Sequence, residues 1–320
     1  MRKNQLTATE AARLLSAADN ILLLTHKNPD GDTLGSAAAL CLALRQVGKT
    51  AYLLNNSTAT GRYLPFFEPV AAPPSFSPSF VAAVDMADLS LAPPEAGPFA
   101  DRIDLCIDHH PSNTFYAKET FLRAEAGATG ELAYEIVRAL GASLTRDIAR
   151  LLYLAIATDT GCFRYANTTP TSLRYAADML DFGIDSVELN TVFFLTKSRP
   201  RFEVERRVME TMEFYRNGSV CLCLVTEDIL RRAGAGEDDV DNISAFPRSI
   251  EGVELGIVLR EQAGGVKVSI RTSDLFDASA ICLTLGGGGH KRAAGAFLPF
   301  PMGEAKRRVL AAIGEGDLPS

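Results

Sequence analysis

The first half of the chain alternates short apolar runs with longer amphipathic stretches. Thr7 and Glu10 have the spacing of a capping box, so the amphipathic residues that follow are expected to form a helix. The apolar run 21–26 is typical of a short buried strand, the stretch 36–48 of a helix that ends at a glycine, and the run 51–56 of a second strand. A strand, a helix and a strand in this order predict a parallel sheet.

Two further apolar runs, 81–88 and 103–110, end in acidic residues and histidines and are also expected to be strands. Helical periodicity covers residues 129–140, 145–158 and 170–181. In open α/β sheets, functional sites assemble at the carboxyl ends of the strands. We therefore expect three strand ends, with the polar residues that follow them, to meet at one edge of the sheet.

The pattern changes in the second half of the chain. Residues 186–215 form an amphipathic stretch that we interpret as a helical linker. Beyond it the pattern predicts three strands and a short helix that leads into a glycine run; these are residues 219–226, 252–261, 265–273, 278–285 and 286–289.

Together these patterns predict an α/β fold with two domains. Residues 1–185 are expected to form an N-terminal domain with a parallel sheet and flanking helices. Residues 216–320 are expected to form a smaller α/β domain.

Composition and charge narrow the class of function. No uninterrupted apolar run approaches the roughly 18 to 20 residues that span a membrane, so a cytoplasmic protein is expected. The net charge of −7 argues against binding of long duplex nucleic acid and favours small phosphorylated ligands. The six cysteines lack CxxC spacing and are expected to be reduced and mostly buried. The densest basic cluster is either a local positive patch or a solvated helix face, and it consists of Lys197, Arg199, Arg201, Arg206 and Arg207.

A first candidate metal motif follows the first strand. His26, Asp30 and Asp32 lie within a short loop that can turn one imidazole and two carboxylates toward a divalent cation. The alternative is that the Asp-Gly-Asp sequence only reverses the chain.

A second candidate motif is the tripeptide Asp108-His109-His110. His109 is the candidate ligand, while Asp108 or His110 orients it or contacts the substrate. The alternative is a pair of histidines satisfied by backbone carbonyls at a strand end. Asp85 and Asp159 each end an apolar run, where an acid without a cation or a donor is costly.

These motifs resemble, in order, the four motifs of the DHH phosphoesterases: THKNPDGDTLGS, VDMAD, DHH and ATDTGCFRY. The run GGGGHKRAAG resembles the signature of their DHHA1 domain. The resemblance implies an active site in the cleft between a DHH and a DHHA1 domain, with two divalent metal ions of which manganese is the expected kind. It implies one ion on His26, Asp30 and Asp85, and the other on Asp32, Asp85, His109 and Asp159.

The resemblance also implies which residues act on the substrate. Asp85, Asp108 and His110 are expected at the catalytic centre. Arg271 and His290 are expected to contact a substrate phosphate, since the fork of an arginine matches phosphate oxygens. The glycine run, with Gly287, Gly288 and Gly289, is expected to be a flexible loop that meets the same anion. Arg164 and Lys291 either neutralise a substrate phosphate or pair with a neighbouring acid.

Within that superfamily the sequence is similar to the stand-alone oligoribonuclease and pAp phosphatase proteins, which implies hydrolysis of very short RNA and of pAp to AMP. Hydrolysis of cyclic di-AMP or pApA is a close alternative. Single-strand DNA exonucleases of the superfamily are longer, and the inorganic pyrophosphatases lack the GGGGH run. A nucleotide sensor that binds without hydrolysis is the alternative from another class. Whether the protein is a monomer or a homodimer stays open.

Overall fold

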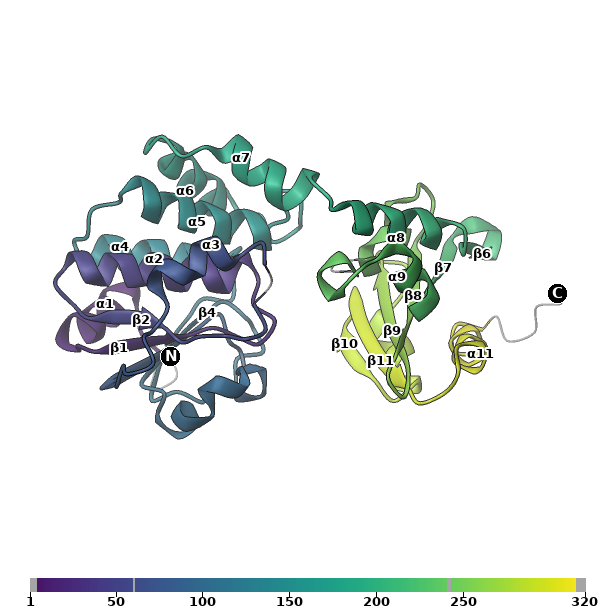
Figure 1. Ribbon diagram of the computed structural model, residues 1–320, viewed down its shortest axis with the longest axis horizontal. Coiled ribbons are helices and arrows are strands. Elements are labelled where there is room, and N and C mark those ends of the chain that lie inside the picture. Colours follow the sequence, from purple (N-terminus) through teal and green to yellow (C-terminus); the bar gives the residue numbers. More distant parts are fainter. Residues whose placement is uncertain (1–4, 60, 241–242, 315–320) are drawn as a thin grey trace. The chain divides into compact units, whose positions relative to one another are not determined.

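The computed structural model describes residues 5–59, 61–240 and 243–314 (Figure 1). Residues 1–4 and 315–320, which the predicted domains include, lie outside the described residues. The contacts divide the chain into two compact units, Met1–Thr196 and Lys197–Ser320. Each unit is an α/β structure built around its own sheet.

The first unit contains five parallel strands, in the order β2-β1-β3-β4-β5. The sequence correctly predicted four of these strands and their parallel arrangement. It missed β5, which has four residues and begins with a glutamate. The bounds are β1 (Ile21–Leu24), β2 (Ala51–Leu53), β3 (Phe80–Val84), β4 (Leu105–Asp108) and β5 (Glu119–Leu122).

Helices α1 and α4 to α6 occur where the sequence predicted them, and Thr7 and Glu10 form the predicted capping box. The start of α2 differs from the prediction. It begins at Gly31 because Asp30 caps it, its carboxylate accepting the N–H groups of Asp32 and Thr33, so Asp32 lies in the first helical turn and not in a loop. The bounds are α1 (Ala8–Ala17), α2 (Gly31–Gln46), α3 (Leu64–Phe67), α4 (Thr129–Ala139), α5 (Arg146–Asp159), α6 (Pro170–Leu180) and α7 (Ser186–Asn190).

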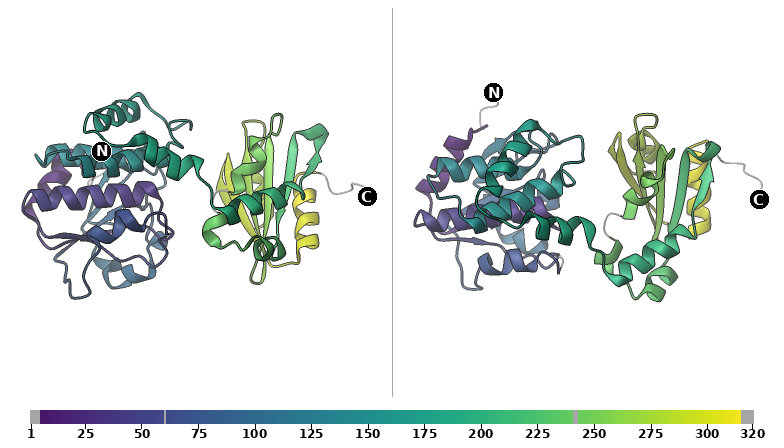
Figure 2. Two further views of the ribbon diagram at one scale, coloured as in Figure 1. Left: turned by 45° about the horizontal axis from the view of Figure 1, so that its top comes forward. Right: turned by 90° about the horizontal axis from the view of Figure 1, so that it is seen from above.

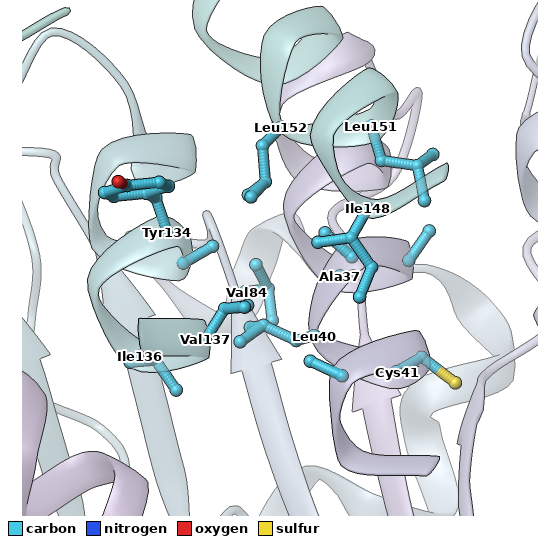
Figure 3. Close-up of a cluster of buried hydrophobic side chains, with 14 of the residues drawn as sticks. Ala37, Leu40, Cys41, Val84, Tyr134, Ile136, Val137, Ile148, Leu151 and Leu152 are labelled. Atoms are coloured by element: carbon cyan, nitrogen blue, oxygen red, sulfur yellow. The ribbon is translucent and has the colours of Figure 1, made fainter. Parts of the chain in front are cut away.

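Three helices cover one face of this sheet. Leu40 of α2, Val137 of α4 and Ile148 of α5 gather around Val84 of β3 (Figure 3), and all four side chains are fully buried. The opposite face carries a smaller cluster in which strand residues pack against the segment around Ala96. Both faces are therefore covered, as in other parallel sheets.

Glycines bring α2, α4 and α5 into close contact. A Cβ atom at Gly35 would lie 2.5 Å from the carbonyl oxygen of Leu151, and one at Gly130 would lie 2.7 Å from Cβ of Ala155. Helix α2 and the start of α4 can therefore approach α5 only because these positions lack a side chain.

The second unit contains a mixed sheet of six strands in the order β10-β11-β9-β8-β7-β6, in which only β7 and β8 are parallel neighbours. Helices α10 and α11 pack on one face, and α8 and α9 pack on the other (Figure 2). The bounds are α8 (Arg199–Met209), β6 (Glu213–Tyr215), β7 (Val220–Val225), α9 (Glu227–Ala233), β8 (Leu255–Gln262), β9 (Gly265–Thr272), α10 (Ala278–Thr284), β10 (Gly288–His290), β11 (Ala293–Leu298) and α11 (Met302–Ala312).

The stretch 186–215, predicted as a helical linker, contains α7, a π-helical turn (Thr191–Leu195), residues 196–198 and α8, and it ends in β6. The prediction of a flexible loop for the glycine run was wrong in part. Gly288 and Gly289 belong to β10 and pair with β11, so their backbone groups are partly committed to the sheet.

The basic cluster is largely neutralised by glutamates on α8 and just after it. Lys197 lies 2.6 Å from Glu205, and Arg207 lies 2.7 Å from Glu203. Arg201 and Arg206 also form ion pairs with glutamates. These contacts favour the solvated helix face over a positive patch.

All six cysteines are free thiols, and five of them are buried. None of the helices in the described ranges is long and apolar enough to cross a membrane.

The close contact between α2 and α5 generates a stability prediction. We expect Gly35→Ala to destabilise the protein by about 1–3 kcal/mol, because its methyl group would overlap the Leu151 carbonyl. Urea unfolding followed by circular dichroism measures the change. Gly303→Ala is the matched control, since Gly303 also lies in a helix and a Cβ there would meet nothing within 4 Å. Equal stability of the Gly35→Ala variant and the wild type would contradict the packing argument.

Candidate metal centre

Acids and imidazoles converge at the carboxyl edge of the parallel sheet. His26 follows β1, Asp85 follows β3, and His109 follows β4, while Asp32 lies at the start of α2 and Asp159 at the end of α5. Their ligand atoms form overlapping groups within 4.8 Å of one another: His26, Asp30 and Asp85; Asp32, His109 and Asp159; and Asp85, His109 and His110. The structure therefore brings together all six residues that the sequence predicted as metal ligands.

His26 and His109 both direct Nε2 toward the carboxylates. Nδ1 of His26 lies 2.8 Å from the carbonyl oxygen of Lys27, and Nδ1 of His109 lies 3.1 Å from that of Ala126. A carbonyl oxygen can only accept, so Nδ1 carries the proton in both neutral rings. Nε2 is then left with a lone pair, which is the arrangement that metal-binding histidines adopt.

The two oxygens of Asp85 face different ligand groups. Oδ2 lies 3.7 Å from Nε2 of His26, and Oδ1 lies 3.7 Å from Nε2 of His109. His26 Nε2 is also 3.8 Å from Asp30, and His109 Nε2 is 3.5 Å from Asp159 and 3.9 Å from Asp32. Asp85 is thus placed between two sets of oxygen and nitrogen ligands.

Burial makes this concentration of negative charge costly. Asp32 is only 1% exposed and Asp85 only 3%. Burial and the charges of neighbouring aspartates raise the pKa of Asp32 well above its usual value. Burial also raises the pKa of Asp85, and that of Asp159 to about 6. Carboxylates that repel one another, with imidazole nitrogens beside them, fit divalent cations, which would neutralise the negative charge.

The remaining acid and histidine of the DHH tripeptide form a separate pair. Asp108 is fully buried and accepts hydrogen bonds from the backbone of His109 and His110, from Nδ1 of His110 at 2.8 Å and from Asn113 at 2.6 Å. Asp108 belongs to none of the ligand groups among the described residues, and its hydrogen bonds orient His109 and His110. Burial lowers the pKa of His110, but Asp108 and the charge of Asp85 raise it to about 9.

The sequence did not predict the contribution of the segment 126–131. Backbone N–H groups of Thr129 and Gly130 donate to Asp32 at 2.7 and 2.8 Å, and the Thr129 hydroxyl donates to Asp85 at 2.8 Å. One feature of the sequence could have indicated this contribution. Ala128, the N-cap residue of α4, has no side chain that can accept the free N–H groups of the helix, so their acceptor had to come from another part of the chain.

The predicted phosphate contacts lie in the second unit. Ala293 of β11 pairs with His290 of β10 on one side and with Arg271 of β9 on the other. Directly paired residues project from the same face of a sheet, so the two cationic or polar side chains share one face with a small alanine between them. Neighbouring strands are about 4.8 Å apart, which separates the two backbones by about 10 Å.

The other two predicted substrate residues lie in turns. Lys291 begins the turn between β10 and β11, and its carbonyl oxygen accepts from Ala278 and Thr272. Arg164 follows Asp159 after a short turn and donates from Nε to the carbonyl oxygen of Gly161 at 2.6 Å. Gly161, Cys162 and Phe163 all have positive φ, so this turn is left-handed.

Comparisons with known proteins agree with this architecture. The sequence is 35% identical over 308 residues to the bifunctional oligoribonuclease and PAP phosphatase NrnA of Thermus thermophilus, which covers 95% of this chain and 92% of that protein. The fold matches the crystal structure of an exopolyphosphatase-related protein from Bacteroides fragilis, with a TM-score of 0.87, 21% identity and 98% of both chains covered. RecJ of Thermus thermophilus in complex with Mn²⁺ is a more distant match, with a TM-score of 0.56 and 16% identity; the match covers 96% of this chain but only 55% of RecJ.

Two family models match the two units of the chain. The DHH family N-terminal domain matches residues 20–156, and the DHHA1 domain matches residues 218–315. The first match contains five of the six candidate ligands, and the second contains Arg271, the glycine run and His290. The chain therefore belongs to the DHH family of phosphoesterases and carries the DHHA1 domain of that family.

Proposed function

We propose that this phosphoesterase hydrolyses very short oligoribonucleotides to mononucleotides and removes one phosphate from pAp to give AMP. The observation that carries the proposal is the position of Asp85 between two ligand groups, each with its own imidazole. The 35% identity to the Thermus NrnA, named for both activities, supports the substrate class. Hydrolysis of cyclic di-AMP or pApA by the same centre is the alternative.

The proposal assigns two divalent ions to the ligand groups. His26, Asp30 and Asp85 would bind one ion, and Asp32, Asp85, His109 and Asp159 would bind the other. Manganese is the proposed metal on the likeness to the DHH phosphoesterases, because oxygen-rich sites with one imidazole each accept manganese, magnesium or cobalt with only modest preference. Two such ions polarise a phosphoryl oxygen and lower the pKa of a bound water.

His110 is proposed to protonate the leaving oxygen. Asp108 accepts from its Nδ1, which leaves Nε2 for the substrate, and the His110 side chain is 42% exposed. Burial lowers the pKa of the ring, but its hydrogen bond to Asp108 raises it and so favours the protonated form. The proton would pass from Nε2 to the departing oxygen, while Asp108 fixes the orientation of the ring.

The second unit is proposed to bind the substrate phosphate. Arg271 and His290 would contact it from one face of the sheet, with Gly287 to Gly289 giving close access to the backbone. Arg164 and Lys291 are proposed as additional cations near the substrate. A clamp of this kind recognises a terminal phosphate, which favours short substrates over polymers.

We also propose which part of the chain has which role. Residues 1–185 form the catalytic domain, residues 186–215 the connection, and residues 216–320 the substrate-binding domain. The matched DHH and DHHA1 regions fall inside the first and the last of these.

The function is tested by initial rates with Mn²⁺ on pAp, RNA dinucleotides, longer RNA, cyclic di-AMP and pyrophosphate. We expect pAp and dinucleotides to be fastest. Asp85→Asn should lower these rates on the order of a thousandfold or more, since metal ions supply several kcal/mol of transition-state stabilisation. Asp181→Asn is the control, because Asp181 is an exposed residue at the end of α6.

Other outcomes of this experiment separate the alternatives. Fastest hydrolysis of cyclic di-AMP would replace the proposed substrate. Binding of pAp without release of phosphate would support a sensor. A nearly unchanged rate in Asp85→Asn would contradict the two-ion mechanism.

The pKa values predict how the metal-free protein responds to pH. Burial lowers the pKa of His26, but Asp30 and Asp85 raise it to about 9. A folded-state pKa above the unfolded value of about 6.5 means that protonated His26 stabilises the fold below that pH, and that this stabilisation is lost as pH rises toward 9. Asp159, with its pKa raised to about 6, acts in the same direction at lower pH.

We therefore expect the Tm of the chelator-treated protein to fall between about pH 6.5 and about pH 9, and the increase in Tm caused by Mn²⁺ to grow over the same range. Differential scanning fluorimetry with and without Mn²⁺ measures both. His26→Asn should reduce the slope of the metal-free protein and leave the part that His110 contributes. Identical slopes with and without metal would show that these groups do not bind it.

The proposed phosphate contact predicts a change in substrate affinity. His290→Ala should raise KM for pAp about tenfold, because a hydrogen bond to a charged phosphate contributes about 1.5–3 kcal/mol. Lys267→Ala is the control, since Lys267 is an exposed cation on the same sheet. An unchanged KM together with an unchanged kcat in His290→Ala would remove this residue from the substrate site.

A further inference from the structure

One short segment contacts three of the six candidate metal ligands directly. Residues 126–131 comprise the end of the loop that follows β5 and the first residues of α4. The carbonyl oxygen of Ala126 lies 3.1 Å from Nδ1 of His109, and that of Gly127 accepts from Asn167, which also donates to a carboxylate oxygen of Asp159 at 3.1 Å. The segment thus contacts His109 directly and Asp159 through Asn167.

The same segment contacts the two buried carboxylates directly. Thr129 and Gly130 donate their backbone N–H groups to the two oxygens of Asp32. The Thr129 hydroxyl donates to Oδ1 of Asp85 at 2.8 Å, and Thr129 itself is fully buried. These contacts are made across 97, 98 and 44 residues of chain.

We propose that Thr129 is a positioning residue of the metal centre, whose hydroxyl fixes the carboxylate of Asp85 so that its two oxygens serve different metal ions. The inference rests on the proposed two-ion function. Thr129 itself lies outside the set of candidate ligands and acts through Asp85.

The geometry of Asp85 explains why such a contact is needed. Asp85 has a φ of +58°, a strained value for an aspartate, and it is the first residue after β3. Its Oδ1 is close to both His109 and His110, while its Oδ2 is close to His26. Rotation of the carboxylate would move one of its oxygens away from His26 or from His109. The hydroxyl hydrogen bond to Oδ1 opposes that rotation.

Thr129 can do this because the segment around it is held in place. Glu131 is only 1% exposed, and its Oε1 accepts from the N–H group of Gly127 at 3.0 Å and from the Ser172 hydroxyl at 2.6 Å. A Cβ atom at Gly127 would lie 2.6 Å from the Ser172 hydroxyl oxygen, so the segment has little room to shift. The hydroxyl is therefore presented from a rigid support.

The test compares Thr129→Val with Thr129→Ser by isothermal titration of the metal-free full-length protein with Mn²⁺. Valine has the shape of threonine but no donor, whereas serine keeps the hydroxyl. Loss of a residue that orients a ligand typically lowers metal affinity about 10- to 100-fold. We expect a loss of about tenfold or more in Thr129→Val, and near wild-type affinity in Thr129→Ser.

Thr120→Val is the matched control, because Thr120 is also a fully buried threonine but its hydroxyl oxygen has no hydrogen-bond partner among the described residues. Its Mn²⁺ affinity should equal that of the wild type. Thr129→Ala is measured as well, so that a folding defect of the valine variant does not decide the result. The Tm of each metal-free variant reports whether the fold is kept.

Electron paramagnetic resonance adds a readout of the bridge itself. Two Mn²⁺ ions that share a carboxylate are magnetically coupled, so the wild type should show a coupled signal and Thr129→Val mainly that of separate ions. Wild-type affinity and coupling in the folded valine or alanine variant would overturn the inference. A wild type that binds Mn²⁺ but hydrolyses none of the tested substrates would instead contradict the proposed function.

Discussion

Mutual repulsion among carboxylates at the carboxyl edge of the parallel sheet is the constraint on which the rest of the structure depends. Asp32 and Asp85 have almost no access to water and lie beside Asp30 and Asp159. Such charges are stable only with strong donors or cations close by. Asp32 receives the free N–H groups at the start of α4, whose dipole also favours a negative charge. The ends of the strands, the start of α2 and the loop before α4 are therefore placed so that donors or cations lie close to these carboxylates.

The close packing of helices serves the same constraint. Asp32 and Asp159 come from different helices, so their carboxylates can approach His109 together only if α2 and α5 nearly touch. Gly31 and Gly35 permit this contact, since a Cβ atom at either position would overlap an atom of α5. The packing of the core therefore sets the geometry of the site in the first unit. A methyl group added between α2 and α5 would move Asp32 and Asp159 apart.

The sequence predicted what depends on local pattern. Apolar runs that end in Asp85 or in the Asp108 tripeptide identify both a strand and the side chains at its end, because the two lie next to each other in the chain. It did not predict β5, whose short length and terminal glutamate give a weak strand signal. It also missed Thr129, which is tied to the site by hydrogen bonds across tens of residues. The wrong start of α2 has a different cause, because an aspartate before a glycine can equally be a turn residue, a metal ligand or a helix cap.

The edge of the first sheet links the metal centre to the N-terminus of the chain. Strand β5 pairs with β4 on one side only, and its other side is covered by residues that precede α1: the N–H group of Leu6 donates to Thr120 at 2.8 Å, and the side chain of Gln5 donates to Leu122 at 3.1 Å. Residues 126–131, which contact Asp32, Asp85 and His109, begin four residues after the end of β5. Edge strands open more readily than central ones, and hydrogen exchange records such local opening. Loss of the Gln5 and Leu6 contacts would therefore loosen β5, and with it the support of the segment that follows, so residues that are not themselves candidate ligands contribute to holding them.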